Sequence, residues 1–159
     1  MNQARYTRPS ALSVTDGNFD FVNDDIRVLL VSNTATFDPT AEFVADIVAD
    51  EVTNDTGTGY ERKTLAGKAR AIVTDVAISG ITGNKDIVRM TAANLTYTNI
   101  NTTTAIGGGY LFKFVTNDAD SLVVASFQLT ANIPSDSVVL PEVVLRPDTT
   151  FGWTYNVIL

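Results

Sequence analysis

The stretch DEVTNDTGTGYERKTLAG, residues 50–67, brings glycines and basic side chains close together, as a phosphate-binding loop does. Such a loop needs the spacing GxxxxGK, followed by Ser or Thr, between a strand and a helix, because the helix N-terminus supplies amides to the phosphate. Here Gly57 and Gly59 lie two residues apart, and no GK pair with Ser or Thr after it follows them. We therefore interpret the glycines as a backbone bend before Tyr60 enters a strand.

Two further groups of residues have the chemistry of a ligand site. Asn117, Asp118 and Asp120 offer oxygens suited to calcium, but the acidic spacing and distant glutamate of an EF-hand loop do not follow. We interpret them as a solvated hairpin turn. The glycines at 107–109 would let a ligand approach the backbone, although such a run is more typical of the flexible start of a hairpin. The sequence predicts neither a metal site nor a cofactor.

The acidic residues are the remaining candidates for catalysis. Asp24 and Asp25 form one pair, and Asp46, Asp50 and Glu51 form a second group. General acid–base work would need a shared cleft that shifts their pKa values, and we interpret them instead as solvated or helix-capping charges. The chain has no histidine and no cysteine, and a serine nucleophile would need a lysine base, yet no Ser-x-x-Lys occurs. We predict no catalytic residues and a protein that is not an enzyme.

Length and composition favour one globular domain. Of 159 residues, 45% are hydrophobic and 18% charged, a balance that allows a buried core. The formal net charge of -7 gives no electrostatic footprint for nucleic acid or an anionic membrane. No apolar run approaches the roughly 18 residues that span a bilayer, and the N-terminus lacks a signal-peptide core. We expect neither nucleic acid nor a membrane as a partner.

The sequence predicts that most of the secondary structure around these candidate residues consists of strands. Apolar and polar residues alternate in three runs: RAIVTDVAIS (70–79), with Ile72 on its buried side, YLFKFV (110–115) and FGWTYNVIL (151–159). IRVLLVS (26–32) and SLVVASFQL (121–129) are continuously apolar, as strands covered on both faces are. Turn residues separate the runs. The sequence therefore predicts an all-β fold, an antiparallel β-sandwich of jelly-roll-like form.

One segment departs from this period. In DPTAEFVADIVADEV, residues 38–52, Asp38 is placed to cap a helix start with Pro39 in the first turn, and apolar residues repeat at i, i+4. We predict one short amphipathic helix or helical turn that lies over the sheet. No linker divides the chain, so we expect an N-terminal arm, residues 1–17, and a single β-sandwich domain, residues 18–159.

Two long blocks of the chain follow a distinctive order: DDIRVLLVSNTATFDPTAEFVADIVADEVTNDTGTGYERKTLAG, residues 24–67, and GGGYLFKFVTNDADSLVVASFQL, residues 107–129. Together they resemble a family of small virion structural proteins of tailed bacteriophages. In that family an opening strand, a loop with a helical turn, an EV...GtGY...L block and a later Y...D...L hairpin recur. Members often carry a glycine pair where this chain has Arg62 and Lys63, and often a basic residue where it has the glycines 107–109.

The resemblance implies a head decoration or cement protein. Such a module sits on the outside of the capsid, contacts the major capsid protein and ties neighbouring capsid subunits together without catalytic residues. Docking at symmetric junctions implies a homotrimer. We therefore expect the protein on the outer capsid surface of a virion, after synthesis in the host cytoplasm.

Two hypotheses from other classes stay open. One is a tail component or receptor-binding module, in which loops such as residues 100–109 contact a host-surface glycan. The other is a carboxylate-dependent glycoside hydrolase, which needs two acidic groups about 5 to 10 Å apart across a cleft.

The N-terminal arm is opposite in charge to the rest of the chain. Residues 1–15 contain Arg5 and Arg8 and no acidic residue, within a chain whose net charge is -7. Tyr6 lies between the two arginines, and Pro9 stiffens the residues after it, giving an extended strip that can add main-chain hydrogen bonds to a neighbour. We predict that Arg5, Tyr6, Arg8 and Pro9 bind a partner, either the capsid or a sister subunit.

Overall fold

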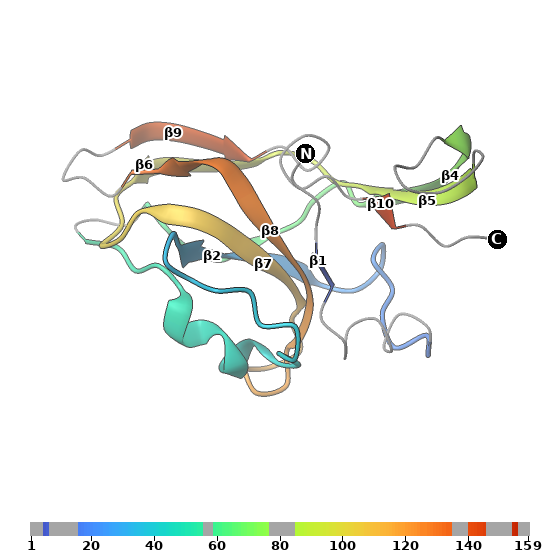
Figure 1. Ribbon diagram of the computed structural model, residues 1–159, viewed down its shortest axis with the longest axis horizontal. Coiled ribbons are helices and arrows are strands. Elements are labelled where there is room, and N and C mark those ends of the chain that lie inside the picture. The colour runs from blue at the N-terminus through green and yellow to red at the C-terminus, as the bar shows by residue number, and fades with distance from the viewer. Residues whose placement is uncertain are drawn as a thin grey trace.

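The computed structural model describes residues 5–6, 16–55, 59–76, 85–134, 140–145 and 154–155 (Figure 1). Their strands are β1 (Arg5–Tyr6), β2 (Ile26–Ser32), β3 (Lys63–Thr64), β4 (Ala69–Val76), β5 (Lys85–Thr91), β6 (Leu95–Ile100), β7 (Ile106–Lys113), β8 (Leu122–Ile133), β9 (Leu140–Leu145) and β10 (Thr154–Tyr155). All strand pairs are antiparallel. The predicted all-β class is confirmed.

The central sheet has the strand order β1-β8-β7-β2-β3. Its strand β2 is buried on both faces, because Val28 and Leu30 belong to one hydrophobic core while Leu29 belongs to another. β8 also contributes to both cores, through Ala125 to the first and Val123 to the second. The two continuously apolar runs are therefore inner strands of this sheet, as the sequence predicted.

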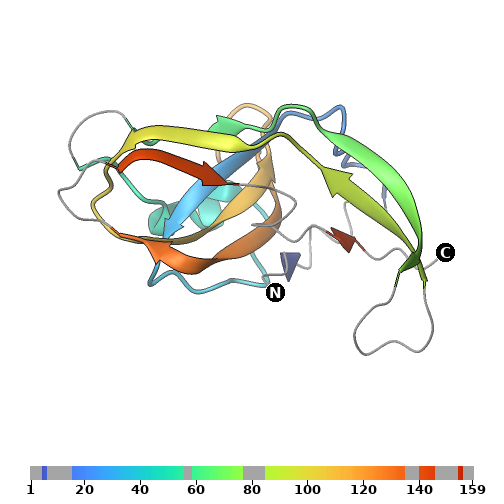
Figure 2. The ribbon, with the colours of Figure 1, turned by 90° about the horizontal axis from the view of Figure 1, so that it is seen from above.

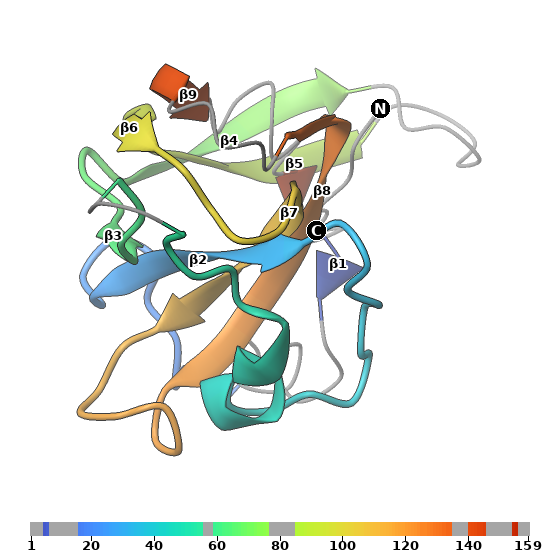
Figure 3. The same ribbon diagram turned by 90° about the vertical axis from the view of Figure 1, so that its left-hand side faces the viewer.

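The two cores lie on opposite sides of the central sheet. Figure 3 shows the elements that cover each side, β6 and β9 on one and the helical segment on the other. On one side the paired strands β6 and β9 cover the sheet, and Leu95, Tyr97 and Ile100 of β6 join the first core. On the other side a helical segment supplies buried residues to the second core, which also contains Tyr110 and Phe112 of β7. Tyr110, Phe112 and Phe114, which follows β7, all contact this second core, so the alternation predicted for the run YLFKFV is confirmed.

The predicted helix consists of two consecutive 3₁₀ turns, η1 (Val44–Asp46) and η2 (Val48–Asp50). In and beside these turns Ala41, Val44 and Ile47 are buried, and they repeat every three positions, the period of a 3₁₀ turn. Val48, which the i, i+4 pattern placed on the buried side, is exposed. At three residues each, neither described turn approaches the length of a membrane-spanning helix.

The cap of this segment differs from the prediction too. Asp38 does not begin the helical segment, because its Oδ1 accepts the backbone N–H of Thr40 in a separate turn (2.7 Å). Asp46 takes the capping role instead: its Oδ2 accepts the N–H groups of Glu42 (3.0 Å) and Phe43 (2.9 Å). An acceptor inside the first turn satisfies these amides as an N-cap side chain would.

Strands β4 and β5 form a hairpin that extends away from the central sheet (Figure 2), and β10 pairs with the other edge of β5. Ile72 of β4 is 62% exposed, so the predicted strand is confirmed but its predicted buried face is wrong at this residue. Alternation of apolar and polar residues identifies a strand, but its apolar face is buried only where another element packs against it. Of the predicted strand 70–79, residues 77–79 lie outside the described residues, and of the run 151–159 only Thr154 and Tyr155 are described.

Candidate functional site

Glu51, Tyr60, Arg62 and Asp118 form one hydrogen-bonded cluster at the edge of the central sheet. The Tyr60 hydroxyl donates to Glu51 Oε1 (2.6 Å) and accepts the backbone N–H of Leu30 in β2 (3.1 Å). Arg62 Nη2 donates to Glu51 Oε2 (2.6 Å) and to Asp118 Oδ2 (2.9 Å). The cluster thus ties the end of η2, the approach to β3 and the β7–β8 turn to one another.

Burial and charge fix the protonation of this cluster. Burial raises the pKa of the Tyr60 phenol, and the nearby Glu51 carboxylate raises it further. Hydrogen bonds to Glu51 and Asp118 raise the pKa of Arg62, while the Arg62 hydrogen bond lowers the pKa of Asp118. Tyr60 and Arg62 therefore keep their protons near neutral pH, and Asp118 stays ionised. Such a cluster holds segments together and is not poised to transfer a proton.

The glycine-rich stretch is held by Asn54. The Asn54 side chain donates to the carbonyl of Tyr60 (2.8 Å) and accepts the Tyr60 N–H (2.7 Å). A Cβ on Gly59 would lie 1.9 Å from the carbonyl oxygen of Asn99, so glycine is needed for close approach to β6. The expectation that Tyr60 enters a strand is wrong, because the strand begins at Lys63. Gly57 lies outside the described residues.

The other acidic candidates have partners of their own. Asp25 pairs with Arg27 (2.7 Å) and Asp24 with Lys113 (3.1 Å). Each carboxylate is thus held in an ion pair with a basic residue, Asp25 within its own strand region and Asp24 with the end of β7.

The Asn117–Asp120 segment is a turn held by its own side chains. Asn117 Oδ1 accepts the N–H of Ala119 (2.8 Å), and Asp120 Oδ2 accepts the hydroxyl of Thr116 (2.7 Å). Asp118 is engaged by Arg62. Across the described ranges, His, Cys, Asp and Glu side chains do not gather in groups of three that could hold a metal ion.

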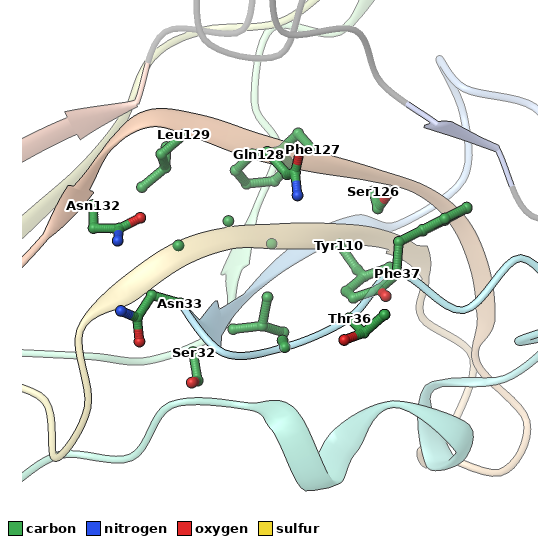
Figure 4. A pocket seen from close by; sticks show the side chains of 15 residues that line it. Ser32, Asn33, Thr36, Phe37, Tyr110, Ser126, Phe127, Gln128, Leu129 and Asn132 are labelled. Carbon is green, nitrogen blue, oxygen red and sulfur yellow. The ribbon is translucent and has the colours of Figure 1, made fainter.

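A pocket of about 320 Å³ lies over β7, between β8 and the segment that follows β2 (Figure 4). Its lining residues are Val31, Ser32, Asn33, Ala35, Thr36, Phe37, Gly107, Gly108, Gly109, Tyr110, Ser126, Phe127, Gln128, Leu129 and Asn132. Asn33 approaches from the loop after β2 and Asn132 from β8, on opposite sides of the β7 ribbon. None of these fifteen residues carries a charge.

A break in strand register opens this pocket. Ile106 of β7 pairs with Ile133 of β8, and Gly108 pairs with Gln128, so one residue of β7 stands opposite residues 129–132 of β8. The extra length of β8 bows away from β7 as a bulge does. Leu129 and Asn132, which lie in the bulge, line the pocket.

The glycines 107–109 are not the flexible start of a hairpin, because they lie inside β7 between β2 and β8. A Cβ on Gly108 would lie 2.3 Å from the carbonyl oxygen of Phe127, and one on Gly109 would lie 2.4 Å from that of Leu29. Both glycines therefore permit close strand contacts. These glycines are the only pocket residues that the sequence indicated as a possible ligand site. No sequence pattern distinguished Asn33, Gln128 and Asn132 from other polar residues.

Two of the four predicted partner-binding residues, Arg5 and Tyr6, are described. Arg5 pairs in register with Ser126, and Tyr6 with Ala125, so β1 is an edge strand on the chain's own β8. Arg8 and Pro9 lie outside the described residues. Ser126 also lines the pocket, so β1 runs beside it. Partner binding by Arg5, Tyr6, Arg8 and Pro9 stays a prediction, as do the boundaries of the arm and the domain.

We expect Tyr60→Phe to lower the free energy of unfolding at pH 7 by about 1 to 3 kcal/mol, because it leaves the buried Leu30 amide without its acceptor and removes one of the hydrogen bonds that Glu51 accepts. Tyr97→Phe is the matched control. Tyr97 stacks on Tyr60, with ring centroids 6.2 Å apart, but its buried hydroxyl has no hydrogen-bond partner among the described residues. Its removal should leave stability unchanged or raised in urea unfolding, and equal losses in both variants would contradict the role of Tyr60.

Comparison of the chain with known protein families, curated proteins and solved structures found no match.

Proposed function

We propose that this chain is a non-enzymatic virion structural protein of a tailed bacteriophage, a decoration protein that binds the outside of the head. One observation carries the proposal. The two blocks that resemble the phage family meet in space, because Arg62 of the first block binds Asp118 of the second, 56 positions away. The tyrosine of the GtGY block and the glutamate of the EV pair lie in the same cluster. The shared blocks thus build one structural unit, as a family framework would.

The proposed mechanism is adhesive. Contacts with neighbouring major capsid proteins form on the assembled shell and add to its resistance against internal DNA pressure. The net charge of -7 suits a protein whose unbound copies must stay soluble before assembly. Individually weak contacts suffice to hold the protein on the shell. Once one capsid subunit is bound, the contact with its neighbour is effectively intramolecular.

We also propose that the fold is an antiparallel β-sandwich, jelly-roll-like in form. The β6–β9 pair would be the second layer over the central sheet. Support comes from the shared core, in which Leu95 and Tyr97 of β6 contact the same cluster as Val28 and Leu30 of β2. Facing sheets bury alternate residues of both layers in this way.

The proposed assembly is a homotrimer, because a three-fold complex meets three equivalent capsid neighbours at once. Light scattering coupled to size exclusion measures this directly. A protein that is monomeric at micromolar concentration and also on the capsid contradicts it.

The test of the function is attachment to expanded capsids that lack the protein. We expect the full chain to bind them and to raise their resistance to heat, while a variant without residues 1–12 binds several-fold more weakly. The same variant should keep its β-type circular dichroism and nearly its melting temperature, because β1 contributes two residues to the sheet.

Two outcomes contradict parts of this proposal. If the shortened protein decorates capsids fully and still forms trimers, the arm does not bind a partner. If the full chain ignores expanded capsids, the decoration role is wrong.

The second candidate function is a tail component or receptor-binding module that contacts a host-surface glycan. The specific observation in its favour is the uncharged pocket, which includes three residues of the predicted glycan-contacting stretch 100–109. Binding of the full chain to host envelope rather than to capsids would favour it. The hydrolase hypothesis gains no support from this pocket, since none of its lining residues is a carboxylate.

A further inference from the structure

We propose that the pocket over β7 binds one uncharged sugar residue of a glycan. The site is defined by Asn33, Thr36, Phe37, Gln128 and Asn132 around the floor formed by β7. This inference goes beyond capsid decoration and does not rest on it, because a virion protein of the head or of the tail could carry such a site.

The absence of charge in the lining selects a neutral ligand. Charged residues make up 18% of the chain, yet none of the fifteen lining residues is charged. A phosphate, carboxylate or ammonium group entering this pocket would lose hydration without gaining an ionic partner among these fifteen residues, which is costly. A sugar hydroxyl loses much less and regains hydrogen bonds.

The polar groups of the rim match a polyhydroxylated ligand. Asn33, Gln128 and Asn132 are exposed, and they reach the pocket from both sides of β7. Each carboxamide offers two donor hydrogens and an acceptor oxygen, and each sugar hydroxyl both donates and accepts. The N–H of Asn33 donates to Ala105 (2.8 Å), which fixes the backbone that carries this side chain.

Aromatic residues supply the apolar part of the site. Phe37 is half-buried at the pocket and packs against the second core, and Tyr110 lies in the wall beside it (Figure 4). The C–H face of a pyranose ring is apolar and packs on aromatic rings, while its edge carries hydroxyls. Phe37 and Tyr110 lie at one end of the pocket and the amides of Asn33 and Asn132 at the other, so the pocket fits the two sides of one sugar ring.

Size and strand topology favour a sugar over a peptide. A volume of about 320 Å³ is at the lower end for ligand pockets, which suits a single ring. A peptide would bind most readily as an added strand at a sheet edge. β7 has neighbours on both sides, β2 and β8, so the floor of the pocket offers no such edge.

The test is titration of the ¹⁵N-labelled full chain with glucose, galactose, mannose, N-acetylglucosamine and sialic acid, followed by amide chemical shifts. We expect at least one neutral sugar to shift the amides of Gly107, Gly108 and Gln128, with a dissociation constant of about 1 mM, and sialic acid to have no effect at the same concentration. The proposal is wrong if no neutral sugar shifts pocket amides at about 50 mM, roughly fifty times that constant, or if the shifts map elsewhere.

Variants at the rim separate this site from unspecific binding. The double variant Gln128→Ala, Asn132→Ala removes two exposed amides and should weaken binding of the responding sugar about tenfold. Asn94→Ala, an exposed asparagine outside the pocket, is the matched control and should bind as the parent does. Unchanged affinity in the double variant, with an intact amide spectrum, overturns the proposal. Tighter binding of an uncharged peptide than of any sugar at these amides overturns it as well.

Discussion

Replacing Gly59 by alanine is expected to lower the free energy of unfolding by about 3 kcal/mol, a large fraction of the stability of an ordinary domain. The added Cβ would lie 1.9 Å from the Asn99 carbonyl oxygen and 2.4 Å from the Ile100 Cα. Both neighbours are backbone atoms of β6, so no side-chain rotation relieves the contact. The substitution must displace β6 from the first core, to which Ile100 belongs.

Gly17→Ala is the matched control for this experiment. Gly17 has a φ of 75°, which disfavours alanine, but a Cβ there meets nothing within 4 Å. We expect a loss of about 1 kcal/mol from the left-handed backbone alone. Urea unfolding of both variants compares a steric with a conformational penalty, and equal losses would show that Gly59 does not approach β6 closely in solution.

The strands of the central sheet were predictable because burial on both faces leaves a direct mark on the sequence. The runs 26–32 and 121–129 are continuously apolar, and both lie in inner strands of the sheet. The helical segment was located correctly but with the wrong period. Val44 and Val48 repeat at i, i+4, and an isolated sequence gives no sign that a 3₁₀ turn will bury positions three apart instead.

The cluster around Arg62 was not predictable, because its partners are brought together by the fold. Arg62 and Asp118 are 56 positions apart, and the sequence predicted only a solvated turn around Asp118. The resemblance placed both blocks in one family but assigned no contact between them. The predicted burial of Ile72 was wrong for the opposite reason. The local pattern around it was clear, but burial depends on what covers a strand, and Ile72 is exposed.

The pocket could not be predicted from the sequence, because a break in the register between β7 and β8 forms it. Between the same two paired positions β8 has four residues, 129–132, and β7 has one. The apolar-to-polar pattern of one strand does not reveal how many residues its neighbour uses over the same distance. Glycines at 107–109 were noticed, yet their role is close strand contact.

Raising the pH above 10 is expected to unfold the protein through its buried tyrosines. Burial raises the pKa values of Tyr60, Tyr97 and Tyr110 above the ordinary value of 10.0. A folded-state pKa above the unfolded one gives a stabilisation that is complete below pH 10 and is lost as the pH rises, because the unfolded chain then releases protons that the fold retains. Each such tyrosine lowers the free energy of unfolding by about 1.4 kcal/mol per pH unit.

Tyr60 and Tyr97 together therefore remove about 3 kcal/mol per pH unit, and Tyr110 acts in the same direction. For a domain of ordinary stability, we expect half-unfolding between about pH 11 and 13. Absorbance at 295 nm, which reports tyrosinate, should rise for these residues together with the loss of β-type circular dichroism. Tyr97→Phe should move the transition to higher pH, since one retained proton is gone. Ionisation of every tyrosine near pH 10 with the β spectrum intact would mean that these phenols are open to solvent.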